Sequence, residues 1–348
     1  MQAVAAISQS ALAHNLAVVH THAPQAKVVS MVKSDAYGHH LDLVTPLFTA
    51  DILAVSELSE ARRLRPLTQK PILLLPGVFN EKDLQETIQL NCHLVFHDLS
   101  QLAILISSKH PVKLWIKVDT GMRRLGIATQ SLPDVLSQID NHKHIQIECI
   151  MSHFACADEP MHPKNIQQLD IFNQLDTKDF HRSMANSAAI MSRAKSRFNY
   201  VRPGIMLYGA SPFANIDEQL MPVMELSAPI LSLKTIKAGE TVGYGATWKA
   251  DKDTRIAIIG IGYGDGYPRH AKNGTPVLIN GTLCTLAGRV SMDLICVDIK
   301  QTSAQIGDRA ILWGNDKLRV ETIASYSQTI AYELLTGVSA RVTFTQSA

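Results

Sequence analysis

The feature that most constrains the fold of this chain is an alternation of short apolar runs with longer amphipathic segments between residues 28 and 210. Eight such runs begin at Val28, Asp51, Pro71, His93, Val112, Ile145, Phe180 and Tyr200. The segments between them show helical periodicity with polar faces. Apolar strands that are buried on both faces and followed by helices predict a parallel sheet. Eight of them favour an α/β fold with a closed, TIM-like (β/α)8 barrel over an open doubly wound sheet.

The pattern changes after about residue 218. Strand-like pieces are then separated by Gly, Asn and Asp turns, with few helical segments between them. The dipeptide Asn280-Gly281, flanked by apolar residues, predicts a two-residue hairpin turn. One helix is expected at roughly 320–335, before a last short strand. We therefore predict a barrel domain over residues 1–218 and a mainly antiparallel β domain over residues 219–348.

The composition excludes several classes of protein. Of the 348 residues, 46% are apolar and 18% are charged, which is typical of a folded globular chain and not of a disordered one. The formal net charge is only +2, with basic and acidic residues interspersed, so we expect no nucleic-acid partner. No apolar stretch reaches the roughly 20 residues of a membrane helix, and residues 1–7 lack the basic region of a signal peptide. We therefore expect a cytoplasmic protein with no membrane partner.

The cysteines and histidines point neither to disulfides nor to a metal. Five cysteines are widely spaced without a C-x-x-C pair, namely Cys92, Cys149, Cys156, Cys284 and Cys296. An odd number with this spacing predicts reduced, mostly buried thiols of a cytosolic protein. The histidines show no metal-ligand spacing, so we expect no bound metal.

Polar residues follow the expected strands at their carboxyl ends, where active sites of such barrels lie. The first run ends in Lys33, and an amine at an apolar barrel mouth has a lowered pKa that favours Schiff-base chemistry. A single lysine at such a place is more often a surface or ion-paired residue. The other strand ends favour a functional role, because they add Lys117, Asp119, Arg123, Arg124, His153, Asn186, Ser187 and Arg202. So many polar groups at one mouth predict a polar ligand.

The last two strand ends have the features of a phosphate site. Ser187 begins an expected helix, and Gly204 allows backbone N–H groups to approach a ligand closely. Phosphate sites in barrels are commonly formed by the loops after strands seven and eight. A lysine, a phosphate site and an aromatic or imidazole platform together predict that the cofactor is pyridoxal 5′-phosphate (PLP).

Nine segments in both regions give the chain a family resemblance. VKSDAYGH, KVDTGMRRLG, MSHFACADEP, ANSAA, VRPGIMLYG, VGYGATW, GYGDGYPR, GRVSMDL and AYELL resemble, in order and approximate spacing, the motifs of alanine racemases. The match covers essentially the whole chain. It departs from the usual pattern at Asp35 and His40, where Asn and Gly are commoner, and this leaves the shape of the substrate entrance open.

The resemblance implies a role for each residue at the barrel mouth. Lys33 would bind PLP as a Schiff base and act as the base on one face of Cα, while Arg124 would contact the phenolic oxygen of PLP and the substrate, and His153 would stack beside the ring. Arg202 would face the pyridine nitrogen, where a guanidinium does not readily give up its proton, so that proton return to Cα is favoured over decarboxylation or transamination. The phosphate would be held by Tyr37, Ser187 with its neighbour Asn186, Gly204, Ile205 and Tyr332.

The resemblance also implies a second acid/base group on the opposite face of Cα. Tyr244 resembles the catalytic tyrosine that comes from the partner subunit of a head-to-tail homodimer, whereas a tyrosine in a β domain is more often an ordinary aromatic on a strand. Asp293 and the Met292 backbone resemble the groups beside that tyrosine and the substrate carboxylate. Tyr263 and Arg269 match positions at the substrate entrance.

Three questions stay open from the sequence. Lys117 is compatible with a carbamylated lysine that positions Arg124 and equally with an unmodified lysine paired with Asp119. The expected reaction is interconversion of L-alanine and D-alanine, for peptidoglycan or for catabolism. A racemase for serine or for several amino acids would use the same machinery, and a protein of another class, a non-catalytic PLP carrier, would need the barrel but no β domain.

Overall fold

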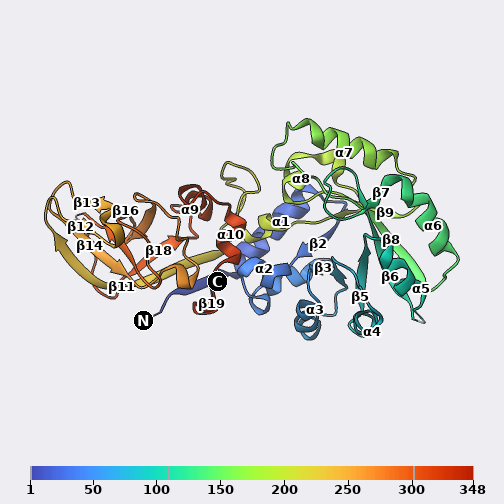
Figure 1. Ribbon diagram of the computed structural model, residues 1–348, viewed down its shortest axis with the longest axis horizontal. Coiled ribbons are helices and arrows are strands. Elements are labelled where there is room, and N and C mark those ends of the chain that lie inside the picture. Colours follow the sequence, from blue (N-terminus) through green and yellow to red (C-terminus); the bar gives the residue numbers. More distant parts are fainter. Residues whose placement is uncertain (1, 109, 301, 348) are drawn as a thin grey trace.

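The computed structural model describes residues 2–108, 110–300 and 302–347. Two regions lie end to end along the long axis of the molecule, with a helix-covered barrel on the right of the view and a β region on the left (Figure 1). The helix α10 (Ala331–Thr336) lies between them and contacts the segment α2 (Lys33–Gly38), which follows the first barrel strand (Figure 1).

The barrel consists of eight parallel strands. In their order around the barrel these are β2 (Lys27–Met31), β3 (Ile52–Val55), β4 (Ile72–Leu74), β5 (Cys92–Phe96), β6 (Val112–Asp119), β8 (Ile145–Met151), β9 (His181–Ser183) and β10 (Tyr200–Val201). The sheet closes because β10 pairs with β2, with Tyr200 opposite Lys27. Each strand overlaps one of the eight apolar runs, so the predicted (β/α)8 barrel is confirmed. A short strand, β7 (Ile127–Ala128), extends from β6.

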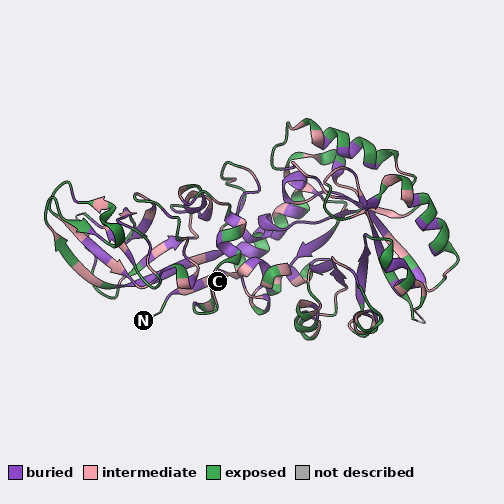
Figure 2. Cartoon of the chain, viewed as in Figure 1, coloured by how far each residue is buried: buried purple, intermediate pink, exposed green. Residues whose placement is uncertain are grey.

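Helices cover the outside of the barrel. They are α1 (Gln9–His22), α3 (Leu58–Leu64), α4 (Glu81–Gln89), α5 (Ser100–Ile106), α6 (Leu132–Asp140), α7 (Pro163–Gln174) and α8 (Ser187–Ser192). Their inner faces are buried against the strands and their outer faces are exposed (Figure 2). This arrangement follows from the alternation in the sequence, because continuous apolar strands need cover on both faces. The helix expected to begin at Ser187 is present.

The β region is built on one long strand, β11 (Met224–Ile236). It pairs with both β14 and β18, which closes an antiparallel sheet of six strands. The other five strands are β14 (Thr254–Ile259), β15 (Pro276–Ile279), β16 (Thr282–Leu286), β17 (Ile295–Asp298) and β18 (Arg309–Trp313), and β12 (Thr241–Val242) forms a separate hairpin with β13 (Trp248–Lys249). Asn280 and Gly281 connect β15 and β16 with φ angles of 45° and 77°, so the predicted two-residue turn is confirmed.

The two ends of the chain meet in the β region. Strand β1 (Val4–Ser8) pairs with β11 and with β19 (Thr343–Ser347), so residues 4–8 belong to this sheet, although the predicted barrel domain includes them. The boundary at residue 218 stays a prediction. The single helix expected at 320–335 was wrong: α9 (Val320–Tyr326) and α10 are separated by residues 327–330, where Gln328 has a φ of 55°. Across the described residues, no helix is both long and apolar enough to span a membrane.

Candidate active site

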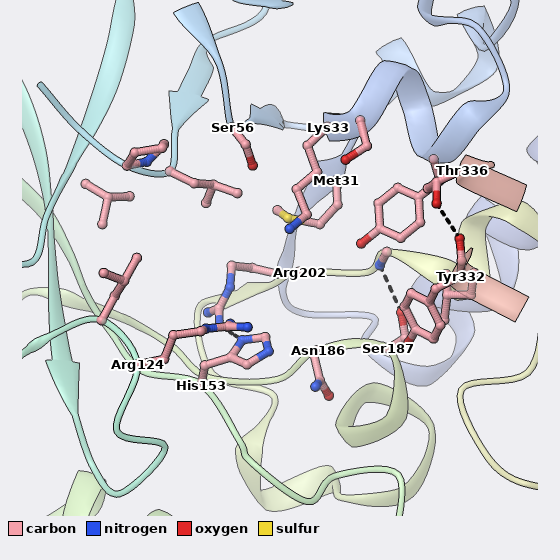
Figure 3. Close-up of a pocket in the computed structure, with 18 of the residues that line it drawn as sticks. Met31, Lys33, Ser56, Arg124, His153, Asn186, Ser187, Arg202, Tyr332 and Thr336 are labelled. Atoms are coloured by element: carbon pink, nitrogen blue, oxygen red, sulfur yellow. Dashed lines mark hydrogen bonds between the residues drawn. The ribbon is translucent and has the colours of Figure 1, made fainter. Parts of the chain in front are cut away.

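A cavity of about 730 Å³ lies at the carboxyl ends of the barrel strands. Figure 3 shows Lys33, Arg124, His153 and Arg202 converging on this space, with Ser187 and Tyr332 at its other side. Eleven residues that the sequence singled out line it, namely Lys33, Tyr37, Lys117, Arg124, His153, Asn186, Ser187, Arg202, Gly204, Ile205 and Tyr332. The barrel and α10 therefore bring together side chains that are up to 299 residues apart in the sequence.

Lys33 begins the segment α2 (Lys33–Gly38), which is a left-handed turn and not an ordinary helix. Ser34, Asp35, Ala36 and Tyr37 all have φ between 51° and 57° and ψ between 37° and 52°. The turn follows directly from β2 and leaves the Lys33 amine at the cavity wall. Burial lowers the pKa of this amine, the Arg124 guanidinium lowers it further, and Glu60 acts in the opposite sense. The amine is therefore easier to deprotonate than an exposed lysine.

The side of the cavity where the sequence predicts a phosphate is formed by α8 and by two tyrosines. The Ser187 hydroxyl accepts a hydrogen bond from the backbone N–H of Gly204 at 2.9 Å. A Cβ on Gly204 would lie 2.4 Å from the hydroxyl of Tyr37, so only glycine allows this approach. Burial raises the pKa of Tyr37 to about 12 and that of Tyr332 as well, which keeps both phenols protonated and able to donate to an anion.

Arg202 is buried and fixed by four contacts. Its Nη1 donates to the Ser183 hydroxyl at 2.6 Å, and its Nη2 lies 2.6 Å from the Ser152 carbonyl, 3.3 Å from the Met184 carbonyl and 3.1 Å from Nδ1 of His153. Burial lowers the pKa of Arg202 to about 10, so it still carries its proton at neutral pH. Burial and the nearby Arg202 lower the pKa of His153 well below its usual range, so the imidazole is neutral.

Lys117 and Asp119 both lie on β6, but the ion pair between them, one of the two alternatives for Lys117, does not appear among the contacts of the described residues. Asp119 instead accepts from the backbone N–H of Gly121 at 2.7 Å and lies 3.7 Å from the Arg123 guanidinium. The pKa of Lys117 is lowered to about 8, first by burial and then by Arg202, Arg124 and Lys33, while Asp119 acts in the opposite sense. Lys117 is thus a half-buried amine that faces other cations.

Five predicted residues lie outside the cavity, in the β region. Tyr244, Tyr263 and Met292 are 70%, 42% and 54% exposed, and Asp293 accepts a hydrogen bond of 2.6 Å from Arg341. Backbone bonds from Tyr263 N to Ser291 O and from Gly264 N to Met292 O hold two of their loops together. The structure therefore gathers the expected residues into two groups, one in the cavity and one on an exposed face of the β region. Arg269 is exposed as well.

Several cavity residues were missed by the sequence reasoning. Ser56 and Pro76 follow β3 and β4. They could have been selected in the same way as Lys33, because they also lie at the carboxyl ends of strands. The residues Ile330, Glu333 and Thr336 come from α10 and the residue before it, and no local pattern places this helix over the barrel mouth.

Family models match both regions of the chain. The description "Alanine racemase, N-terminal domain" matches residues 7–212, and "Alanine racemase, C-terminal domain" matches residues 223–346. The chain belongs to the alanine racemase family. The "Alanine racemase" of Vesicomyosocius okutanii is 59% identical over 99% of this chain and 98% of its own length, and the "Alanine racemase, biosynthetic" of Escherichia coli K12 is 43% identical over 98% of each.

Solved structures of alanine racemases have the same fold. The biosynthetic alanine racemase of Pseudomonas aeruginosa superposes with a TM-score of 0.95 at 41% identity and covers 100% of this chain and 99% of its own. The alanine racemase of Bartonella henselae, solved with covalently bound pyridoxal phosphate, has a TM-score of 0.92 at 28% identity and covers 100% of both chains. The expected family and cofactor are therefore confirmed.

The cavity of this racemase fits PLP. Its volume is that of a small-molecule site. The neutral phenols of Tyr37 and Tyr332 and the Ser187 hydroxyl can donate to a phosphate around the space left by Gly204. Lys33 supplies the amine that an aldehyde requires.

Proposed function

We propose that this alanine racemase interconverts L-alanine and D-alanine with PLP held on Lys33, and that Tyr244 of the partner subunit is the second acid/base group. When bound, PLP supplies a conjugated ring that acidifies the C–H bond at Cα of an attached amino acid. The chain itself must hold the cofactor, orient Cα and move a proton on each of its faces.

Lys33 is suited to one of these proton transfers. Its lowered pKa raises the fraction of neutral amine at Nζ, the form that accepts a proton from Cα. Arg202 keeps its own proton and therefore does not protonate the pyridine nitrogen that we expect it to face. Arg124 lies at the same wall and supplies a positive charge for a carboxylate or a phenolate.

The observation that carries the proposal is that the amine and the phenol lie in separate places within one chain. Lys33 lies in the cavity, whereas Tyr244 is 70% exposed on the β region. A single base reaches only one face of Cα, so racemisation needs a second group from elsewhere. A head-to-tail homodimer, in which the β region of one subunit covers the barrel mouth of the other, would supply it.

The exposed face of the β region supports such an assembly. Tyr244, Tyr263, Met292 and Leu294 are large apolar side chains that are all more than a third exposed. Exposed apolar groups collected near connected loops are typical of protein interfaces. In the dimer, Tyr263 and Met292 would border the substrate entrance, and Asp293 would lie beside the substrate carboxylate and Tyr244.

Two alternatives differ in what they predict. A racemase for serine or several amino acids would turn over those substrates as well as alanine. A PLP carrier would bind the cofactor without turnover, but the family match extends through the β region, which a carrier does not need.

We further propose that the enzyme supplies D-alanine in the cytoplasm, where its five thiols, all free in the described residues, stay reduced.

The test is incubation of the purified protein with L-alanine in deuterated water. We expect loss of circular dichroism together with deuterium at Cα. L-serine is the matched substrate control for specificity. A yellow protein that gives neither change would contradict the proposal and favour a carrier.

A further inference from the structure

The left-handed turn that carries Lys33 requires an anchor. Four consecutive residues other than glycine, from Ser34 to Tyr37, adopt the left-handed conformation. Each is less stable than a right-handed residue by roughly 1–2 kcal/mol, so the turn persists only where surrounding contacts fix it. The turn also joins two parts of the site, because Lys33 and Tyr37 stand at its ends.

Glu60 of α3 provides such an anchor. Its Oε1 accepts a hydrogen bond of 3.1 Å from the backbone N–H of Asp35, within the turn. Its Oε2 accepts from the backbone N–H groups of Ser56 at 2.9 Å and Glu57 at 3.1 Å, after the end of β3. One carboxylate thus fixes two adjacent strand ends at the cavity, and Ser56 itself lines that cavity near Lys33 (Figure 3).

We propose that Glu60 is a positioning residue that holds the turn carrying Lys33 and places a negative charge where it acts on the Lys33 amine. This inference rests on the proposed attachment of PLP to Lys33. It adds a residue outside the cavity wall that controls how readily that attachment forms.

The charges around Lys33 make the role of Glu60 specific. Other titratable groups line the cavity that holds Lys33. They include Lys117 on β6, His153 after β8, Arg124 in the loop after β6, Arg202 directly after β10, and Glu333 of α10. The Arg124 guanidinium lowers the pKa of Lys33, whereas Glu60, which lies behind the cavity wall, raises it. Removing the carboxylate therefore increases the fraction of neutral Lys33 at a given pH.

Capture of PLP reports on this fraction directly. The Nζ lone pair of neutral Lys33 attacks the aldehyde carbon, a C=N bond forms, and the aldehyde oxygen leaves as water with the two amine protons. The rate of capture by the cofactor-free, full-length protein therefore rises with pH as Lys33 loses its proton. The titration of PLP itself is common to all variants and cancels in a comparison between them.

The experiment compares wild type with Glu60→Gln, Glu60→Asp and Arg63→Gln. We would strip the cofactor with hydroxylamine, follow capture by absorbance across a pH series, and confirm Lys33 by borohydride reduction and peptide mass. Arg63→Gln is the matched control, because Arg63 lies on the same helix and holds the same turn through Asp35 at 3.0 Å without acting on Lys33. Thermal melting establishes that each variant is folded.

We expect the midpoint of capture to move to lower pH in Glu60→Gln and to stay near the wild-type value in Glu60→Asp and Arg63→Gln. Glu60→Asp should retain PLP about tenfold less tightly, since its shorter side chain loses a hydrogen bond to a charged acceptor. A wild-type midpoint in Glu60→Gln, or an equal shift in Glu60→Asp or Arg63→Gln, would overturn the role of Glu60 but not the proposed function. Failure of wild type to attach PLP at Lys33 would instead overturn the proposed function.

Discussion

Nη2 of Arg202 lies 3.1 Å from Nδ1 of His153, at the wall of the cavity. An arginine has only donors, so Nδ1 accepts and the proton of the neutral imidazole is on Nε2. The same guanidinium donates to the Ser152 carbonyl and the Ser183 hydroxyl, which fixes its plane. Arg202 therefore sets both the tautomer and the orientation of His153.

Arg202→Lys tests this relationship. A lysine keeps the charge but lacks the planar fork, so it cannot reach Ser183, Ser152 and His153 together. We expect kcat/KM for alanine to fall by about 100-fold in both directions, a loss of the size seen when a positioned polar donor is removed from an active site. Melting should occur several degrees lower, because hydrogen bonds of a buried charge are lost.

The matched control is Arg197→Lys. Arg197 also donates to two backbone carbonyls, of Ile190 and His22, but it lies outside the cavity. This variant should melt at lower temperature with kcat/KM close to wild type. Similar activity losses in the two variants would mean that Arg202 acts only through stability.

Gly204→Ala should weaken PLP binding. The new methyl group would lie 2.4 Å from the Tyr37 hydroxyl, and Tyr37 cannot move freely because its ring stacks on Tyr208 with centroids 4.8 Å apart. Overpacking of this kind costs about 1–3 kcal/mol, so we expect the dissociation constant of PLP to rise about 10- to 100-fold. Equilibrium titration of the cofactor-free protein measures it.

A second substitution identifies the clash as the cause. In a Tyr37→Phe background the hydroxyl is absent, so Gly204→Ala should have a smaller effect on PLP affinity than it has in wild type. Additive effects of the two substitutions would show that the methyl group disturbs some other contact.

The sequence predicted the barrel because its strands are buried on both faces. Runs such as the one containing β4 are apolar throughout, and even the two-residue strand β10 lies in a recognisable run. Residues at the strand ends, such as Lys33 and His153, could be selected for the same reason, since closure of the barrel brings all carboxyl ends to one mouth.

Features fixed by distant contacts could not be predicted in this way. Residues 4–8 carry no local sign that β1 pairs with β11 and β19, more than 200 residues away. The left-handed turn contains Gly38 as its only local cue, and the bond from Asp35 to Glu60 joins the turn to a residue of α3 that lies 25 residues further along the chain. Residues 327–330 interrupt the helix expected at 320–335 without a glycine or proline. In each case tertiary contacts override the local pattern.

Lys117 should bind carbon dioxide reversibly. Only a neutral amine forms a carbamate, and the pKa of about 8 means that the neutral fraction grows as pH rises through that value. The anionic product would also be favoured by Arg124 and Arg202, which lower the pKa of the free amine. At a fixed pressure of ¹³C-labelled carbon dioxide, we expect one carbamate resonance in the NMR spectrum that grows from pH 7 to 9.

Lys117→Arg is the control for this carbamate. The guanidinium keeps the positive charge but does not react, so the resonance should disappear while the protein still folds. A resonance that persists in this variant would place the carbamate elsewhere. Its absence from wild type across the pH series would leave Lys117 as an unmodified amine and contradict the prediction.

Mixing two inactive variants tests whether Tyr244 acts across a dimer. Lys33→Ala removes the amine, and Tyr244→Phe removes an exposed phenol without disturbing the core. If each site combines Lys33 of one subunit with Tyr244 of the other, a mixed dimer holds one intact site and one doubly substituted site. Random exchange in an equal mixture should then restore about a quarter of wild-type activity. If both groups act within one chain, no mixed dimer contains an intact site. The activity of the mixture would then stay at the level of the separate variants. This result, in a mixture shown to exchange subunits, would exclude the head-to-tail arrangement.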